Sequence, residues 1–178
     1  DVFTGQELLM LTGHHEWVNC LSFDPKGRML ASVSWDGDIK LWHAATNSQV
    51  AWTYADEAHH LAIENEPNEE SIPMALELAE LALRLAPDDD NLKQIRAVTS
   101  LRAGRASEAI IELEMPGDPE TETDCIYRLF LAMAYHLTDN RDQAIRCYNQ
   151  VERWMKVNKT KQPLLYRVQR EAEAKLGV

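Results

Sequence analysis

The sequence of 178 residues has few cysteines and no long apolar run. Its three cysteines stand far apart without a CxxC pair, which argues against a zinc signature and a disulfide framework. We expect Cys20, Cys125 and Cys147 to be free, buried thiols of a reducing compartment. No apolar stretch comes near the roughly 18 residues that a membrane helix needs, and no secretory leader follows Asp1. We therefore expect a cytoplasmic segment without membrane contact. Its start at Asp1 instead of Met fits a processed or truncated product.

Basic residues are also scarce, because 18 Lys and Arg stand against 29 Asp and Glu and give a net charge of −11. The deficit is uneven: residues 1–55 carry −3, residues 56–120 carry −11 and residues 121–178 carry +3. A chain this acidic repels phosphate backbones, so its composition argues against nucleic acid as a partner. The mildly basic last third can still accept an acidic partner.

Catalytic and metal-binding motifs are missing from the sequence. A nucleophile elbow needs Gly-x-Ser-x-Gly, whereas Ser32 stands in Leu-Ala-Ser-Val-Ser. The pairs His14-His15 and His59-His60 lie 45 residues apart with no suitably spaced acidic or cysteine ligand, so we expect no metal site. A Gly-rich loop, an HRD motif and a DFG motif, which mark protein kinases, are absent too. We expect no enzyme and no cofactor in these residues.

Residues 1–55 have the pattern of an antiparallel β meander. Short apolar or alternating segments recur about every ten residues, with turn residues between them. Asp24-Pro25-Lys26-Gly27 fits a turn with Pro at its second position, and Asp36-Gly37 is a two-residue hairpin signal. The pattern predicts strands over residues 6–11, 18–23, 29–34, 39–43 and 49–54.

Residues 13–42, GHHEWVNCLSFDPKGRMLASVSWDGDIKLW, resemble a WD-repeat blade, and the resemblance extends over residues 5 to about 54. In that family a His, a Ser or Thr, an Asp and a Trp form a buried hydrogen-bond network. The resemblance implies these structural roles for His14, Ser32, Asp36 and Trp42. His15 in place of His14, and Ser34 in place of Ser32, remain alternatives. His43 departs from the family, which usually has Asp after the Trp.

A β-propeller needs about 4–8 such blades, whereas this segment has room for one blade and one strand of the preceding blade, residues 6–11. The resemblance therefore implies the C-terminal part of a longer WD-repeat protein.

Helical periodicity replaces the strand pattern after residue 55. The pattern predicts helices over residues 56–66 and 71–86, from the acidic run 88–90 to near 104, over 106–115, and from 163 to 177. Between 115 and 163 it predicts two further helices, joined tightly by residues 139–141 and packed antiparallel. Their apolar faces carry Ile126, Phe130, Met133 and Leu137 in the first, and Ala144, Tyr148, Val151 and Met155 in the second. Ser71 is a predicted N-cap, the Asp88-Asp89-Asp90 run caps the next helix, and Gly104 ends it. We therefore predict an α+β fold in two parts, with a β meander over residues 1–55 and an all-α domain over residues 56–178.

The helix pairs recur near 34 residues and resemble tetratricopeptide repeats. The clearest copy places small and large residues at Leu131, Ala132, Tyr135, Ala144 and Tyr148. Weaker copies comprise Ala97, Gly104, Ala109 and Leu113, and before them Ala75, Ala79, Ala82 and Pro87. The resemblance implies a helix-pair array with the last helix as its cap, and an array of this kind binds peptides in a groove.

Candidate groove residues are polar or aromatic residues on the first helix of each pair: Arg96, Arg128, Tyr135 and His136. Packing between repeats is the alternative for Tyr135, and solvated surface is the alternative for Arg128. Trp154 and Tyr166 are expected to be core or inter-helix contacts.

The combination resembles the C-terminal end of large bacterial proteins that carry WD repeats and a helical tail, some of them with a kinase domain upstream. It implies a non-enzymatic protein–protein interaction scaffold with a protein or peptide partner. The alternative is a regulatory or targeting tail of an upstream enzyme, such as a bacterial serine/threonine protein kinase.

Overall fold

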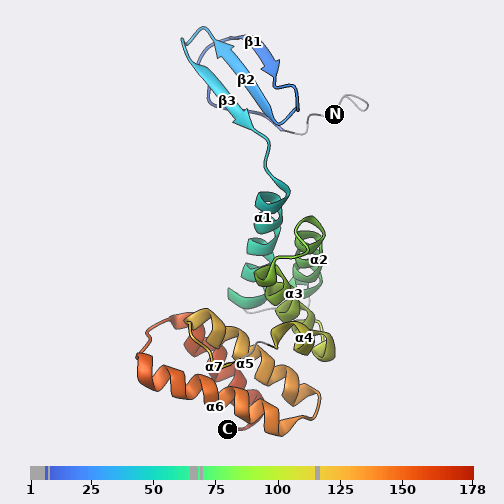
Figure 1. Ribbon diagram of the computed structural model, residues 1–178, viewed down its shortest axis with the longest axis vertical. Helices are drawn as coiled ribbons and strands as arrows, with labels where there is room; N and C mark the ends of the chain where they lie inside the picture. The colour runs from blue at the N-terminus through green and yellow to red at the C-terminus, as the bar shows by residue number, and fades with distance from the viewer. Residues whose placement is uncertain (1–6, 8, 65–67, 69, 115–116) are drawn as a thin grey trace. The chain divides into compact units, whose positions relative to one another are not determined.

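The computed structural model describes residues 7, 9–64, 68, 70–114 and 117–178. The chain divides into two compact units, Asp1–Thr46 and Asn47–Val178. An antiparallel sheet forms the first unit and helices form the second (Figure 1). The expected two-part α+β fold is confirmed. The division falls after Thr46, however, and not after residue 55 as the sequence pattern suggested.

The sheet contains β1 (Val18–Phe23), β2 (Met29–Ser34) and β3 (Ile39–His43) in the order β1-β2-β3, with both pairs antiparallel. Asp24 closes the first turn, because its carboxylate accepts hydrogen bonds from the backbone N–H groups of Arg28 and Met29 at 2.5 and 2.7 Å. Gly37 takes a φ of +87° in the second turn, a conformation that favours glycine. These three strands lie where the sequence pattern predicted them.

The strand predicted over residues 49–54 is wrong, because these residues lie inside helix α1 (Asn47–His59). Three small residues, Ala51, Ala55 and Ala58, recur at helical spacing and are buried, since α1 packs closely against α2. Burial of these three alanines favours a helix more strongly than the short apolar run favours the predicted strand. Of the other expected strand, residues 6–11, only residues 7 and 9–11 are described, and none of these four belongs to a strand.

The second unit is a succession of helices in which each helix packs on the next, and α7 packs mainly on α5. A π-helical turn, η1 (His60–Glu64), continues α1, so the separate helix predicted over residues 56–66 does not form. The remaining helices are α2 (Ser71–Leu85), α3 (Asp90–Arg102), α4 (Ala106–Leu113), α5 (Glu122–Leu137), α6 (Arg141–Asn158) and α7 (Pro163–Leu176).

Local signals explain several of the helix ends. Asp89 caps α3 by accepting hydrogen bonds from the N–H groups of Asn91 and Leu92, as the acidic run predicted. Gly104 follows α3 with a φ of +81°, which also agrees with the prediction. Ser71 is not an N-cap but the first residue of α2, because Asn68 precedes it and accepts its backbone N–H at 2.8 Å.

The core of the helical unit lies around α5, where Leu129, Phe130 and Leu131 are buried. Arg102 crosses this core: its guanidinium stacks over the Phe130 ring at 5.0 Å, binds Glu171 on α7 and donates to the Ala62 carbonyl of η1. A single side chain thus joins η1, α3, α5 and α7.

Two of the three cysteines follow the expectation. Cys125 and Cys147 are free and buried, and burial raises the pKa of the Cys125 thiol to about 12. Cys20 is free but exposed, contrary to the expectation, because the residues of β1 are all exposed.

Candidate functional site

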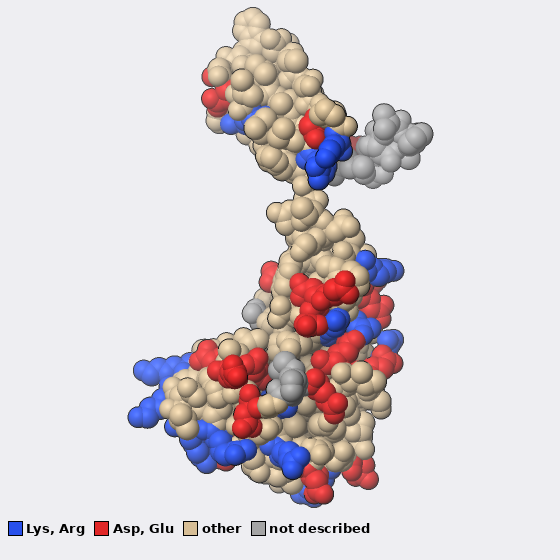
Figure 2. All heavy atoms as spheres, viewed as in Figure 1, with Lys and Arg blue, Asp and Glu red and all other residues tan. Residues whose placement is uncertain are grey.

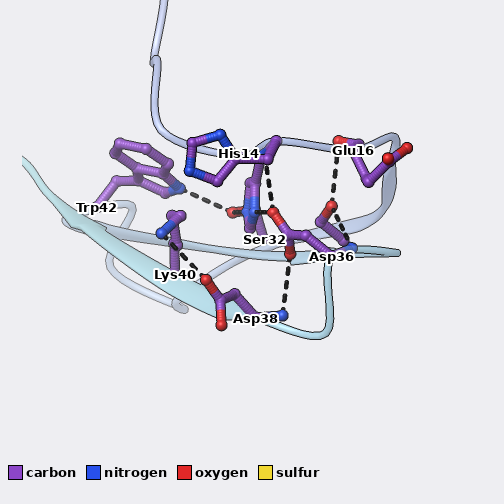
Figure 3. Close-up of polar contacts among 9 residues, drawn as sticks. His14, Glu16, Ser32, Asp36, Asp38, Lys40 and Trp42 are labelled. Atoms are coloured by element: carbon purple, nitrogen blue, oxygen red, sulfur yellow. Dashed lines mark hydrogen bonds and ion pairs between the residues drawn. The ribbon is translucent and has the colours of Figure 1, made fainter.

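The four blade residues implied by the WD resemblance meet in one hydrogen-bonded chain (Figure 3). His14 bonds through Nδ1 to Asp36 Oδ2 at 2.9 Å and through Nε2 to Ser32 Oγ at 2.7 Å. The indole N–H of Trp42 donates to the same Ser32 hydroxyl oxygen at 2.9 Å. A neutral His14 with its proton on Nδ1 satisfies all three contacts, since the Ser32 hydroxyl can then donate to Nε2.

The alternatives His15 and Ser34 take different places beside this network. The backbone N–H of His15 donates to Asp36 Oδ2 at 2.9 Å, while the Ser34 hydroxyl donates to the Glu16 carbonyl at 3.1 Å. The hydrogen bond from the His15 backbone holds the pKa of Asp36 below its usual range, and bonds from Asp38 and His14 add to it. Asp36 therefore carries a negative charge that the surrounding turn stabilises.

This arrangement differs from a hydrolase triad although it holds Ser, His and Asp. Ser32 is only 2% exposed, and its hydroxyl oxygen is the shared acceptor for Trp42 while it contacts His14. A nucleophile must reach its substrate and be activated by the base, whereas this hydroxyl is enclosed. The geometry supports a structural network that joins β2, β3 and the segment before β1.

Both faces of the sheet carry exposed apolar side chains. The strand pairing places Val33 opposite Ile39, and Ala31 opposite Leu41, on one face. Leu21 and Phe23 lie on the other face with Ser32 and Trp42. Phe23 is 70% exposed and Ile39 is 68% exposed. Figure 2 shows few charged side chains over most of this unit, in contrast to the helical unit. Exposed apolar surface on this scale marks a place where another surface packs.

Two exposed tryptophans lie at one end of the sheet. Trp17 and Trp35 are joined through a backbone hydrogen bond of 3.0 Å from Trp35 N to Trp17 O, and with Glu16 they line a cavity of about 320 Å³. The sequence analysis did not single them out, because a lone Trp is more often core than surface.

Two of the predicted groove residues, Arg128 and Tyr135, line one cavity of about 450 Å³. They stand two turns apart on α5, and the opposite wall comes from α6. Arg128 is 7% exposed and donates from Nη2 to the Gly117 carbonyl at 2.8 Å. The Tyr135 hydroxyl donates to the Glu114 carboxylate, and burial together with this bond raises the tyrosine pKa to about 12.

The other two predicted groove residues lie apart from this cavity. Arg96 lines a separate cavity of about 510 Å³ and forms an ion pair with Glu112, to which its Nε donates at 3.2 Å. His136 is half-buried near the end of α5 and does not line either cavity. The structure thus brings together only two of the four. Trp154 packs against the core, and its indole N–H donates to the Glu120 carbonyl at 3.2 Å.

Sequence reasoning missed the α6 wall of the Arg128 cavity. Gln143, Arg146 and Gln150 recur at i, i+3 and i+7, so they share one side of α6. The spacing of these polar residues is a signal in the sequence, but the apolar stripe of the same helix is the stronger one.

Among the described residues, no group of three or more His, Cys, Asp or Glu side chains is arranged to hold a metal ion. Within the same described ranges, no helix has the length and apolar character needed to cross a membrane.

Comparisons with known proteins identify the first unit. The WD domain, G-beta repeat family matches residues 5–43. Periodic tryptophan protein 2 of Saccharomyces cerevisiae is 47% identical over 49 residues, which cover 28% of this chain and 5% of that protein. A serine-threonine kinase receptor-associated protein of Dictyostelium discoideum is 50% identical over 42 residues, 24% of this chain and 14% of that protein.

A third relative extends further along the chain. The probable E3 ubiquitin ligase complex SCF subunit scon-2 of Neurospora crassa is 32% identical over 123 residues, which cover 66% of this chain and 17% of that protein. No solved structure matches the chain significantly.

The chain therefore contains a WD repeat, which ends at residue 43 and not near residue 54. It spans less than a fifth of the length of these three relatives. All three are eukaryotic, so they do not support the expectation of bacterial proteins with the same layout, and they show no enzyme family. The tetratricopeptide resemblance of the helices stays a prediction.

Proposed function

We propose that this chain is a non-enzymatic protein-interaction scaffold, in which one blade of a WD-repeat β-propeller is followed by a tetratricopeptide-like helical array. The observation that carries the proposal is the WD repeat itself, whose polar side chains bond to one another while its apolar side chains face outward. A unit built in this way offers apolar surfaces on which another protein can pack. The polar side chains of its hydrogen-bond network are bonded to one another and are not accessible for a reaction.

The exposed faces support the assignment of residues 5–43 to a propeller blade. A small sheet gains folding free energy mainly by burying an apolar face, whereas this sheet has apolar residues exposed on both faces. Blades of a propeller stand side by side, so neighbouring blades cover both faces of each one. We infer that the whole protein supplies such neighbours.

The helical unit supports the second half of the proposal. Helices α1 to α6 pack in chain order, and α7 packs mainly on α5. The small residues of the repeat pattern are fully buried, namely Ala97, Ala109, Ala132 and Ala144. Arrays of stacked helix pairs present extended surfaces that bind proteins and peptides. The cavity between α5 and α6 is a polar recess on this surface.

A peptide-display selection on the intact 178-residue chain tests the scaffold function. We expect a shared motif to be enriched, with peptide affinities on the order of 1–100 μM and amide signals of the helical unit shifted on binding. An unrelated protein of similar net charge serves as the control. Selection that enriches no motif beyond this control contradicts the proposal.

Light scattering tests the blade. Because both faces are apolar, we expect the chain to self-associate as its concentration rises. Ile39→Lys should reduce this association, while Ile111→Lys, at an exposed position of α4, should not. A wild-type chain that stays monomeric at every concentration would contradict the inference that the faces need covering.

A further inference from the structure

The cavity between α5 and α6 is the most polar recess among those described above. Arg128 and Tyr135 form its α5 wall, and Gln143, Arg146 and Gln150 form its α6 wall. Glu114 and Gly117, from the connection before α5, close one end. Guanidinium, amide and phenol groups line the cavity from three segments; the Gln150 amide donates to Asp118 at 2.7 Å and the Tyr135 hydroxyl donates to Glu114. Such a lining suits a polar group better than an apolar side chain.

The fixed charges of this cavity sum to one positive charge. Arg128 and Arg146 contribute two positive charges, and Glu114 contributes one negative charge. Glu114 accepts a hydrogen bond from Tyr135. A cavity with two guanidinium groups and one carboxylate favours an anion with a single charge.

The two arginines of the cavity differ in burial and in the contacts that hold them. Arg128 is buried and held by the Gly117 carbonyl, so its guanidinium has a fixed position. Arg146 is exposed at the rim, and it makes no ion pair with any residue that the structure describes. A guanidinium carries five N–H donors, so one arginine can bind several acceptors at once, and Arg128 already bonds to the Gly117 carbonyl and to the Cys147 side chain.

We propose that this cavity binds an aspartate or glutamate carboxylate from an acidic segment of a partner protein. The proposal rests on the scaffold function above and names the chemistry of its partner. The surroundings agree with it, because residues 121–178 carry a net charge of +3 in a chain of −11. Figure 2 shows Lys and Arg gathered over the part of the helical surface that α6 forms in Figure 1.

A carboxylate fits the cavity better than a phosphate. A phosphate monoester brings a charge of about −1.5 to −2 at neutral pH, and Glu114 in the wall repels a second negative charge. The volume of about 450 Å³ also leaves room for the side chain that carries the carboxylate.

The test uses the intact chain and a capped peptide, acetyl-Gly-Gly-Glu-Glu-Glu-Gly-Gly-amide, at physiological salt. We expect binding with a Kd on the order of 0.1–1 mM, and shifts of the Gln143 and Gln150 side-chain amide signals and of the arginine Nε–H signals in NMR spectra. The same peptide with Gln in place of Glu should not bind. A version with phosphoserine at the central position should bind no more tightly than the Glu peptide.

Matched variants separate a site from bulk charge. Arg146→Gln should weaken binding about fivefold or more, because it removes a charged hydrogen-bond donor. Arg170→Gln makes the same charge change at an exposed position of α7 that does not line the cavity, and it should weaken binding less than about twofold. Both positions are exposed, so both variants should fold.

Four results would overturn the proposal: no shift of the cavity signals, equal weakening by both variants, equal binding of the Gln peptide, or binding of the phosphoserine peptide about tenfold tighter. A neutral peptide from the display selection that binds elsewhere on the helical unit, while the Glu peptide fails, would leave the scaffold function intact and remove this site. If neither peptide binds, both proposals fail.

Discussion

The sheet unit and the helical unit differ in where they keep their apolar side chains. In the helical unit large apolar residues such as Phe130 and Leu129 are fully buried and form a core. In the sheet unit Phe23, Ile39 and Trp35 are mostly exposed, and two serines, Ser32 and Ser34, are among the buried residues. The helices therefore build a core of their own, whereas the sheet is organised around a polar network.

This difference indicates that the two units depend on their surroundings to different degrees. Burial of apolar surface is the main source of folding free energy, and the helical unit obtains it internally. The sheet obtains little, so its stability has to come from hydrogen bonds and from whatever covers its faces.

Phe130→Ala should cause the largest loss. Removing a fully buried aromatic ring typically costs about 3–5 kcal/mol of unfolding free energy, and this ring also faces Arg102. Urea unfolding followed by circular dichroism measures the loss, with Leu137→Ala, 56% exposed on the same helix, as the control. The indole signal of Trp42 should stay unchanged, and a change there would show that the two units are coupled.

Arg102→Met should cost about 2 kcal/mol, because it leaves the partly buried Glu171 carboxylate without its main cation. Burial raises the pKa of Glu171, but hydrogen bonds and charge from Arg102 and Lys175 outweigh it and lower the pKa overall. Arg105→Met is the matched control, since Arg105 is half-exposed and pairs loosely with Glu80 at 3.7 Å. Equal losses for both variants would contradict the role assigned to Arg102.

Ser32→Ala should act only on the sheet. It removes the oxygen that His14 and Trp42 share, which costs about 1–2 kcal/mol and should speed solvent exchange of the Trp42 indole proton about fivefold or more. Ser22→Ala, at an exposed position of β1, is the control. An unchanged exchange rate for Ser32→Ala would mean that the network does not hold the sheet together.

Acidification should give the smallest effect. Because the pKa of Asp36 is lowered by folding, its contribution is complete above the ordinary aspartate pKa of about 3.9 and is lost as the pH falls from there toward the folded-state value. The indole N–H signal of Trp42 in NMR spectra recorded between pH 7 and pH 2 follows this loss. Asp36→Asn should flatten the profile, whereas Asp38→Asn should leave it in place.

Much of the sheet followed from its sequence because turn chemistry is local. Gly37 takes the positive φ of the second turn, but this turn is longer than the two-residue hairpin that Asp36-Gly37 predicted, since β2 ends at Ser34 and β3 begins at Ile39. The network followed from a family resemblance, and the geometry then distinguished His14 from His15. Residues 49–54 misled the prediction because helix and strand compete for a short apolar run, and burial of Ala51 and Ala55 against α2 decided the outcome.

Only the α5 side of the cavity between α5 and α6 was predicted from the sequence. Arg128 and Tyr135 were chosen for their type and their helix, but their partners Arg146 and Gln150 come from the facing helix. Which polar stripe of α6 faces α5 depends on how the two helices rotate about their axes, and tertiary packing sets that rotation. Arg96 was predicted to line the same groove, but it lines another cavity, where it forms an ion pair with Glu112.

Arg102 has a consequence for the order in which the helices assemble. Its bond to Ala62 spans 40 residues of sequence and its bond to Glu171 spans 69. Contacts between such distant residues require costly loop closure and tend to form late in folding. We expect docking of α7 to be the closing step, so in stopped-flow measurements Arg102→Met should accelerate unfolding while leaving the folding rate nearly unchanged. The arginine then acts as a kinetic latch, which sets how long the finished array stays closed.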